Sequence, residues 1–185
     1  MLALLVLIAL GTWGLDQFTK HLVVTNLVEG GPAVPVIGEI LQFRFVKNSG
    51  AAFSLASGFT WILSLVAIAV VGVIVWFSGR IRSARWAAVF GLILGGALGN
   101  LTDRLFREPG FGVGHVIDFI QLIYFPAIFN VADIAITSSM VLFVLLTLFG
   151  IGLDGKRHAA AKPVTGAADA QTSESGAPGR GSEES

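Results

Sequence analysis

The sequence contains an uninterrupted apolar stretch at residues 59–77, which reads FTWILSLVAIAVVGVIVWF and carries no charged side chain. A helix must run for about 20 apolar residues to cross the roughly 30 Å hydrocarbon core of a bilayer. This stretch is therefore predicted to be a transmembrane helix, and the rest of the chain is interpreted outward from it.

Three further stretches of similar length are nearly free of charge, at residues 1–24, 86–102 and 128–153. The first is interrupted by Asp16, Lys20 and His21. It lacks a positive n-region and a clear small-residue cleavage site before Asp16, so we expect a transmembrane helix and not a cleaved signal peptide. The pattern predicts four spanning helices.

The composition agrees with a membrane protein. Of the 185 residues, 54% are hydrophobic and 13% are charged, and the mean hydropathy is +0.79; soluble domains carry about 25% charged residues. Twelve basic and twelve acidic residues leave no basic excess for nucleic acid. The absence of cysteine excludes disulfides and thiolate catalysis, and three scattered histidines make no zinc signature, so no cofactor is expected.

Basic residues near the ends of the predicted helices indicate the orientation. Arg80, Arg82 and Arg85 lie between the second and third helices, and Lys156 and Arg157 follow the fourth. Lys and Arg in short loops tend to stay in the cytoplasm. We therefore expect both termini in the cytoplasm and the segments 25–58 and 104–126 on the outer face.

The chain is expected to divide into a membrane-embedded domain, residues 1–153, and a tail, residues 154–185. The tail is rich in Ala, Gly, Ser and Glu and almost lacks large apolar side chains. Such a composition cannot bury enough surface to order itself, so a disordered cytoplasmic tail is predicted.

Two outer segments have recognisable patterns. Leu41, Phe43 and Phe45 alternate with polar residues, which predicts a strand with one apolar face. Residues 116–124 are mostly apolar and are expected to lie along the membrane surface.

The charges in the predicted helices gather at one depth, near the outer interface. A charge within the bilayer costs about 2.5 to 3.5 kcal/mol, so each needs a reason. Asp16 and Lys20 have the i, i+4 spacing of an ion pair on one helical face. The pair either lets the helix end tolerate two charges or supports an active site.

The third predicted helix carries a glycine stripe and a polar end. Gly91, Gly95 and Gly99 recur every four residues, which permits close approach of another helix. Beyond them, the side chains of Asn100, Asp103 and Arg104 are suited to holding a peptide backbone or another carboxylate.

Two aspartates, Asp118 and Asp133, stand among apolar neighbours with no adjacent base. If they meet, the two carboxyl groups would share a proton and could activate water, which is the chemistry of an aspartic peptidase. Asn130 and Thr137 share the helical face of Asp133. Taken alone, two aspartates at the outer interface are more often solvated helix ends than a catalytic pair.

Five short motifs occur in order along the chain: DQFTK at 16–20, NSGAAF at 48–53, GGALGNLTDR at 95–104, VIDF at 116–119 and FNVAD at 129–133. With these motifs the sequence resembles the lipoprotein signal peptidases, also called signal peptidase II, which are membrane aspartic peptidases. Each string is weak alone, but five in this order are highly specific.

The resemblance implies an enzyme that cleaves the signal peptide from bacterial prolipoproteins, before a cysteine modified with diacylglycerol. It implies that Asp118 and Asp133 are the catalytic dyad. Further residues of the motifs would bind substrate or support the site: Asp16, Lys20, Asn48, Gly50, Asn100, Asp103, Arg104, Asn130 and Ala132.

The same resemblance implies a fold and partners. To the four spanning helices it adds an outer β-cradle and a surface helix, which would fall within residues 34–47 and 105–125. Prolipoproteins and membrane lipids would be the partners, globomycin an inhibitor, and the bacterial cell membrane the location.

Two other functions remain open from the residues alone. Lys20 and Ser54 could form a serine–lysine peptidase dyad. Alternatively, membrane acids could relay ions in a small carrier, which would spread charges through the bilayer depth.

Overall fold

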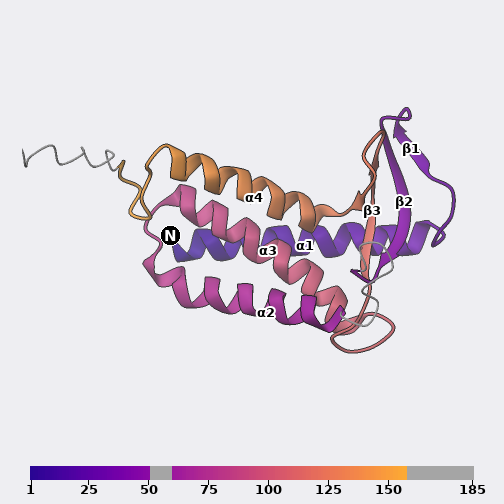
Figure 1. Cartoon of the computed structure of the whole chain (residues 1–185), viewed down its shortest axis with the longest axis horizontal. Helices are drawn as coiled ribbons and strands as arrows, with labels where there is room; N and C mark the ends of the chain where they lie inside the picture. The colour runs from indigo at the N-terminus through magenta and orange to yellow at the C-terminus, as the bar shows by residue number, and fades with distance from the viewer. Residues whose placement is uncertain (51–59, 158–185) are drawn as a thin grey trace, which may run out of the picture.

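The computed structural model describes residues 1–50 and 60–157, which form four long helices and a four-stranded sheet (Figure 1). The helices are α1 (Leu2–Asn26), α2 (Thr60–Phe77), α3 (Ala84–Phe106) and α4 (Val131–Leu148), with a 3₁₀ turn, η2 (Ser78–Arg80), after α2. All four long helices have the length and hydropathy to cross a membrane. The expected four-helix membrane protein is confirmed.

Helix α3 lies at the centre of the bundle and packs against the other three helices. The glycine stripe makes this packing possible. A Cβ atom at Gly95 would lie 2.6 Å from the carbonyl oxygen of Ala9 on α1, and one at Gly96 would lie 2.7 Å from that of Ala132 on α4. Side chains at these positions would push α1 and α4 away from α3, as expected for a packing stripe.

The sheet lies at the end of the bundle far from the N-terminus, with its strands running across the helix axes (Figure 1). It contains β1 (Val34–Ile37), β2 (Leu41–Asn48), β3 (Val116–Leu122) and β4 (Ile128–Phe129), in that order and all antiparallel. Val23 of α1 packs with Phe45, Ile117 and Phe119 of the sheet. The strand predicted around Leu41 is confirmed and extends to Asn48.

The prediction of a surface helix within residues 105–125 is wrong. Helix α3 continues to Phe106, and residues 116–122 form β3, which pairs with β2 and β4. Val116 to Phe119 are buried without alternation, because the sheet is covered on both faces here. This apolar run therefore gave no period-2 signal. The fourth spanning helix also begins later than expected, at Val131, since Ile128 and Phe129 pair with β3.

The chain folds back after α4, at the other end of the bundle. The indole nitrogen of Trp86 donates to the carbonyl oxygen of Ile151 at 3.0 Å, and Ile151 forms a bridge with Arg157. Residues 154–157 thus belong to a hydrogen-bonded turn, although the tail was expected to begin at residue 154. The rest of that segment, residues 158–185, lies outside the described residues.

Candidate active site

Asp118 lies in the middle of β3 and is 3% exposed. Two asparagines donate to its carboxylate: Asn130 Nδ2 to Oδ1 and Asn48 Nδ2 to Oδ2, both at 2.7 Å. Burial raises the pKa of Asp118 to about 6, while the Asn48 hydrogen bond lowers it and the charge of Asp133 raises it. This carboxyl can therefore change protonation state near neutral pH.

Asp133 lies in the first turn of α4, where it forms a reciprocal cap with Asn130. The Asp133 N–H donates to Asn130 Oδ1 at 3.0 Å, and the Asn130 N–H donates to Asp133 Oδ2 at 3.1 Å. This capping box begins the helix. The other carboxylate oxygen, Oδ1, accepts a 2.9 Å bond from Asn100 Nδ2 on α3.

Asn130 connects the two acids. Its backbone N–H and side-chain Oδ1 hold Asp133, while its Nδ2 donates to Asp118 and, at 3.1 Å, to Asn100 Oδ1. The side chain is completely buried. Asp118 and Asp133, which are expected from the sequence to meet, therefore share one hydrogen-bonded cluster.

Both acids line a cavity of about 490 Å³ between the sheet and α4. Its other lining residues are mainly apolar: Asn48, Leu122, Phe125, Ala127, Ile128, Phe129, Ile134, Thr137 and Ser138. An apolar cavity with a few convergent polar groups is the usual form of a ligand site.

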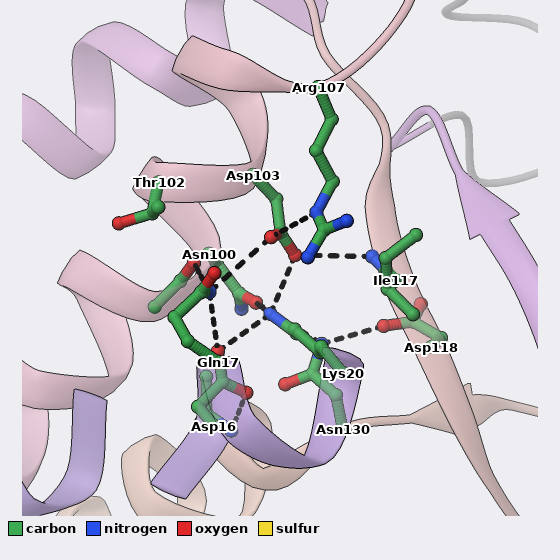
Figure 2. A network of polar contacts seen from close by, with 12 residues as sticks. Asp16, Gln17, Lys20, Asn100, Thr102, Asp103, Arg107, Ile117, Asp118 and Asn130 are labelled. Carbon is green, nitrogen blue, oxygen red and sulfur yellow. Dashed lines mark hydrogen bonds and ion pairs between the residues drawn. The ribbon is translucent and has the colours of Figure 1, made fainter. Parts of the chain in front are cut away.

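A buried ion network lies behind the cluster (Figure 2). Lys20 Nζ is 2.8 Å from Asp16 Oδ2 and 2.7 Å from Asp103 Oδ2, and all three side chains are fully buried. The predicted Asp16–Lys20 pair is confirmed, and Asp103 completes it from α3. Asp103 also contacts Arg107 Nε at 2.6 Å. Its carboxylate is thus occupied within the protein and does not line the cavity.

The network holds the backbone beside each acid. Asp16 Oδ1 accepts the N–H of Ala132 at 2.9 Å, and Asp103 Oδ2 accepts the N–H of Ile117 at 3.2 Å. Ala132 directly precedes Asp133, and Ile117 directly precedes Asp118.

Gly50 and Arg104 lie at the edge of the site. The Gly50 N–H donates to Asn48 Oδ1 at 2.7 Å, and its φ of +81° is one that glycine adopts readily. A Cβ here would collide with Leu63. Arg104 has a buried Nη1 without a hydrogen-bond partner among the described residues, and it lies within electrostatic range of both acids.

Two members of the network are absent from the sequence-based site. Gln17 Nε2 donates to the Gly99 carbonyl oxygen at 3.0 Å and lies 3.3 Å from Asp103 Oδ1. Arg107 pairs with Asp103 at i, i+4, a spacing that could have identified it. Motif residues 51–53 and Ser54 lie outside the described residues.

Residues 8–149 match the signal peptidase (SPase) II family over three quarters of the chain. The chain belongs to the signal peptidase II family. It is therefore a peptidase, a hydrolase that acts on signal peptides.

Individual relatives of this signal peptidase II chain support the same family assignment. It is 62% identical to the lipoprotein signal peptidase of Leifsonia xyli over 157 residues, which are 85% of this chain and 72% of the relative. It is 46% identical to the lipoprotein signal peptidase of Mycobacterium tuberculosis H37Rv over 160 residues, 85% of this chain and 78% of the relative.

Solved structures show the same fold. One bacterial membrane enzyme superposes with a TM-score of 0.69 at 27% identity, covering 84% of this chain and 94% of that one. Another has a TM-score of 0.69 at 30% identity, covering 78% and 92%.

Proposed function

We propose that this peptidase removes the signal peptide from bacterial prolipoproteins, just before a cysteine modified with diacylglycerol, and that Asp118 and Asp133 activate the attacking water. The observation that carries the mechanism is the hydrogen-bonded cluster in which Asn130 contacts both carboxylates beside one cavity. Its relatives bear the name lipoprotein signal peptidase, which supports the substrate class.

In this mechanism the dyad holds one proton and a water lies between the two carboxyl groups. The ionised carboxylate takes a proton from the water while the water oxygen attacks the scissile carbonyl carbon. The protonated carboxyl then donates its proton to the leaving amine, and the carbon–nitrogen bond breaks. Both proton transfers stay within the dyad, so the reaction needs no cofactor.

The surroundings of the dyad fit a lipidated peptide. Among the described residues, the buried Nη1 of Arg104 has no hydrogen-bond partner, and the guanidinium lies within electrostatic range of both acids, which suits the main-chain carbonyl of a bound peptide. The cavity is lined largely by apolar side chains such as Phe125 and Ile134. Acyl chains in the outer leaflet could remain in lipid while the peptide enters beneath the sheet.

The serine–lysine alternative has less support. Lys20 is fully buried and its Nζ already contacts two carboxylates and Asn100, so it does not have the free amine that a general base needs. Ser54→Ala should accordingly leave cleavage unchanged.

A gel-shift cleavage assay on a diacylglyceryl-modified precursor tests the proposal. Asp118→Asn and Asp133→Asn should each abolish cleavage, because neither variant can complete both proton transfers, while both proteins remain in the membrane. Glu108→Gln, which changes an exposed carboxylate outside the cavity, serves as the control. Full turnover by either aspartate variant would refute the dyad.

The same assay tests the substrate. An unmodified precursor should be cleaved far more slowly than the lipidated one, and globomycin should block cleavage of the latter. Equal rates on both precursors would contradict the requirement for the lipid.

A further inference from the structure

Three asparagine side chains contact the dyad, and each has its carbonyl oxygen held by a group that can only donate. Asn48 Oδ1 accepts the N–H of Gly50 at 2.7 Å, and Asn130 Oδ1 accepts the N–H of Asp133 at 3.0 Å. Asn100 Oδ1 accepts from two donors, the ammonium of Lys20 at 3.0 Å and Asn130 Nδ2 at 3.1 Å, of which only the ammonium is charged. A side-chain amide has one accepting end and one donating end, so fixing its oxygen fixes the direction of its NH2 group.

In all three cases the NH2 group points to a dyad carboxylate. Asn48 and Asn130 donate to the two oxygens of Asp118, and Asn100 donates to Asp133 Oδ1 at 2.9 Å. For Asn48 and Asn130 the holding group is a backbone N–H. For Asn100 both donors are side chains, and the charged one, Lys20, can be substituted without changing a residue that contacts Asp118.

We propose that Lys20 is a positioning residue of the peptidase, whose buried ammonium fixes the amide of Asn100 so that its NH2 group donates to Asp133. This inference rests on the proposed function, because it takes Asp133 to be a member of the dyad. Lys20 itself acts through Asn100 and does not contact the reacting atoms.

The geometry suits this role. An ammonium has three N–H donors and no acceptor, and Lys20 Nζ has three partners, at 2.8 Å (Asp16), 2.7 Å (Asp103) and 3.0 Å (Asn100). Its two carboxylate partners accept the N–H groups of Ala132 and Ile117, next to the two acids. The ammonium is therefore held between α1 and α3, and its carboxylate partners connect it to the two segments that carry the acids, β3 and the start of α4.

A simpler role would be that Lys20 only neutralises Asp16 and Asp103. The two roles predict different behaviour when a charge is removed together with its counter-ion. In Asp16→Asn/Lys20→Met, Asp103 still contacts Arg107 and the amide at position 16 can still accept the Ala132 N–H. In this double variant no ammonium is needed to neutralise residue 16, but Asn100 still lacks the hydrogen bond from the Lys20 ammonium.

Steady-state kinetics on the lipidated precursor and thermal unfolding in detergent micelles separate these roles. Lys20→Met should lower kcat about 10- to 100-fold, the loss expected for one hydrogen bond to a charged group, with KM little changed. Adding Asp16→Asn should restore the unfolding temperature but leave kcat low. Recovery of kcat in this double variant would overturn the proposal. The double variant also keeps the test decisive if Lys20→Met alone does not fold.

A double-mutant cycle with Asn100→Ala gives a second test. If Lys20 acts through Asn100, the variant carrying both Asn100→Ala and Lys20→Met should lose no more kcat than the more damaging single variant. Multiplicative losses would overturn the proposal.

The matched control is Thr102→Val. It removes the 3.0 Å hydrogen bond from Trp13 Nε1 on α1 to Thr102 Oγ1 on α3. Figure 2 shows the Thr102 side chain pointing away from the ion network, so kcat should stay unchanged. The aspartate variants above keep the two hypotheses distinct. If they retain cleavage, the proposed function fails; if they are inactive while Asp16→Asn/Lys20→Met is fully active, only the role of Lys20 fails.

Discussion

Asn130 illustrates how much of the site depends on single polar residues. At the N-cap of α4 it performs the usual task of satisfying the free N–H groups of a helix start. The same side chain donates to Asp118 and Asn100. One residue thus begins the helix, places Asp133 in its first turn and connects it to β3.

The raised pKa of Asp118 predicts how catalysis depends on pH. With a pKa of about 6, Asp118 is mostly protonated below pH 6 and mostly ionised above it. The proposed mechanism needs one proton on the dyad, so kcat/KM should fall as pH rises through about 6. A pH profile of kcat/KM on the lipidated precursor measures this limb, and a rate that rises through the same range would contradict it.

Asn48 should influence the pH at which kcat/KM falls. Its Nδ2 donates to Asp118 Oδ2 and so favours the ionised form. Asn48→Ala should raise the pKa of Asp118 and move the falling limb to higher pH, by about one unit. Glu108→Gln is the control and should leave the limb in place; a shift of the Asn48→Ala limb to lower pH would be inconsistent with the contact.

At the scale of elements, α3 organises the molecule because its small residues let two other helices come close. Gly91 and Gly95 face α1, and Gly96 faces α4. The close approach brings Lys20 of α1 within hydrogen-bond distance of Asn100, and Asn100 within reach of Asp133. The helix packing and the polar cluster therefore depend on the same helix.

Gly95→Ala should destabilise the protein by about 1 to 3 kcal/mol, since its Cβ would lie 2.6 Å from Ala9 O and from Thr12 Cβ. Gly72→Ala is the matched control, because a Cβ there meets nothing within 4 Å. It should be neutral or slightly stabilising, as alanine favours a helix over glycine. Unfolding in detergent micelles compares the two, and equal stabilities would argue against a packing role for Gly95.

The helices could be predicted from the sequence because a bilayer requires long charge-free stretches, a signal that lies within each segment. The Asp16–Lys20 pair was also local, at i, i+4. Strand β3 was missed because residues covered on both faces lose the alternating pattern. The contact of Asp16 with Ala132 spans 116 positions, and no periodicity in the sequence encodes such a distance.

The site was identified mainly through ordered motifs, since spacing alone gave no reason to bring Asp118 and Asp133 together. Three of the nine supporting residues lie behind the two acids and not in the cavity: Asp16, Lys20 and Asp103 are fully buried in the ion network. Gln17 went unnoticed although it lies inside the first motif, because an uncharged amide in an apolar helix offers little contrast with its neighbours.

For the whole molecule, the buried charged side chains of α1 and α3 lie toward the end that carries the sheet, since Asp103 pairs with Lys20 and accepts the N–H of Ile117 in β3. Figure 1 shows the sheet at the end of the bundle far from the N-terminus. The other end carries the exposed basic residues Arg80, Arg82 and Arg85. We propose that the basic end faces the cytoplasm, together with the domain boundary near residue 154 and the tail that follows.

Cysteine labelling, read on the purified protein, tests this orientation without a competing thiol in the same chain, because the sequence contains no cysteine. In intact cells a membrane-impermeant maleimide should label Glu39→Cys, on the exposed turn between β1 and β2, and should not label Arg85→Cys. Permeabilised cells provide the control in which both are labelled. The reverse pattern in intact cells would invert the proposed orientation.

The hydrogen bond from Ala132 to Asp16 has a consequence for biogenesis. Asp16 belongs to α1 and Ala132 to α4, the first and last of the described helices to leave the ribosome, and chains acquire structure from the N-terminus during synthesis. A nascent chain in which only α1, α2 and α3 have been inserted lacks Asp133 and the Ala132 N–H that Asp16 accepts. With Asp133 as a member of the proposed dyad, proteolytic competence arises in a single late step, when α4 enters the bilayer.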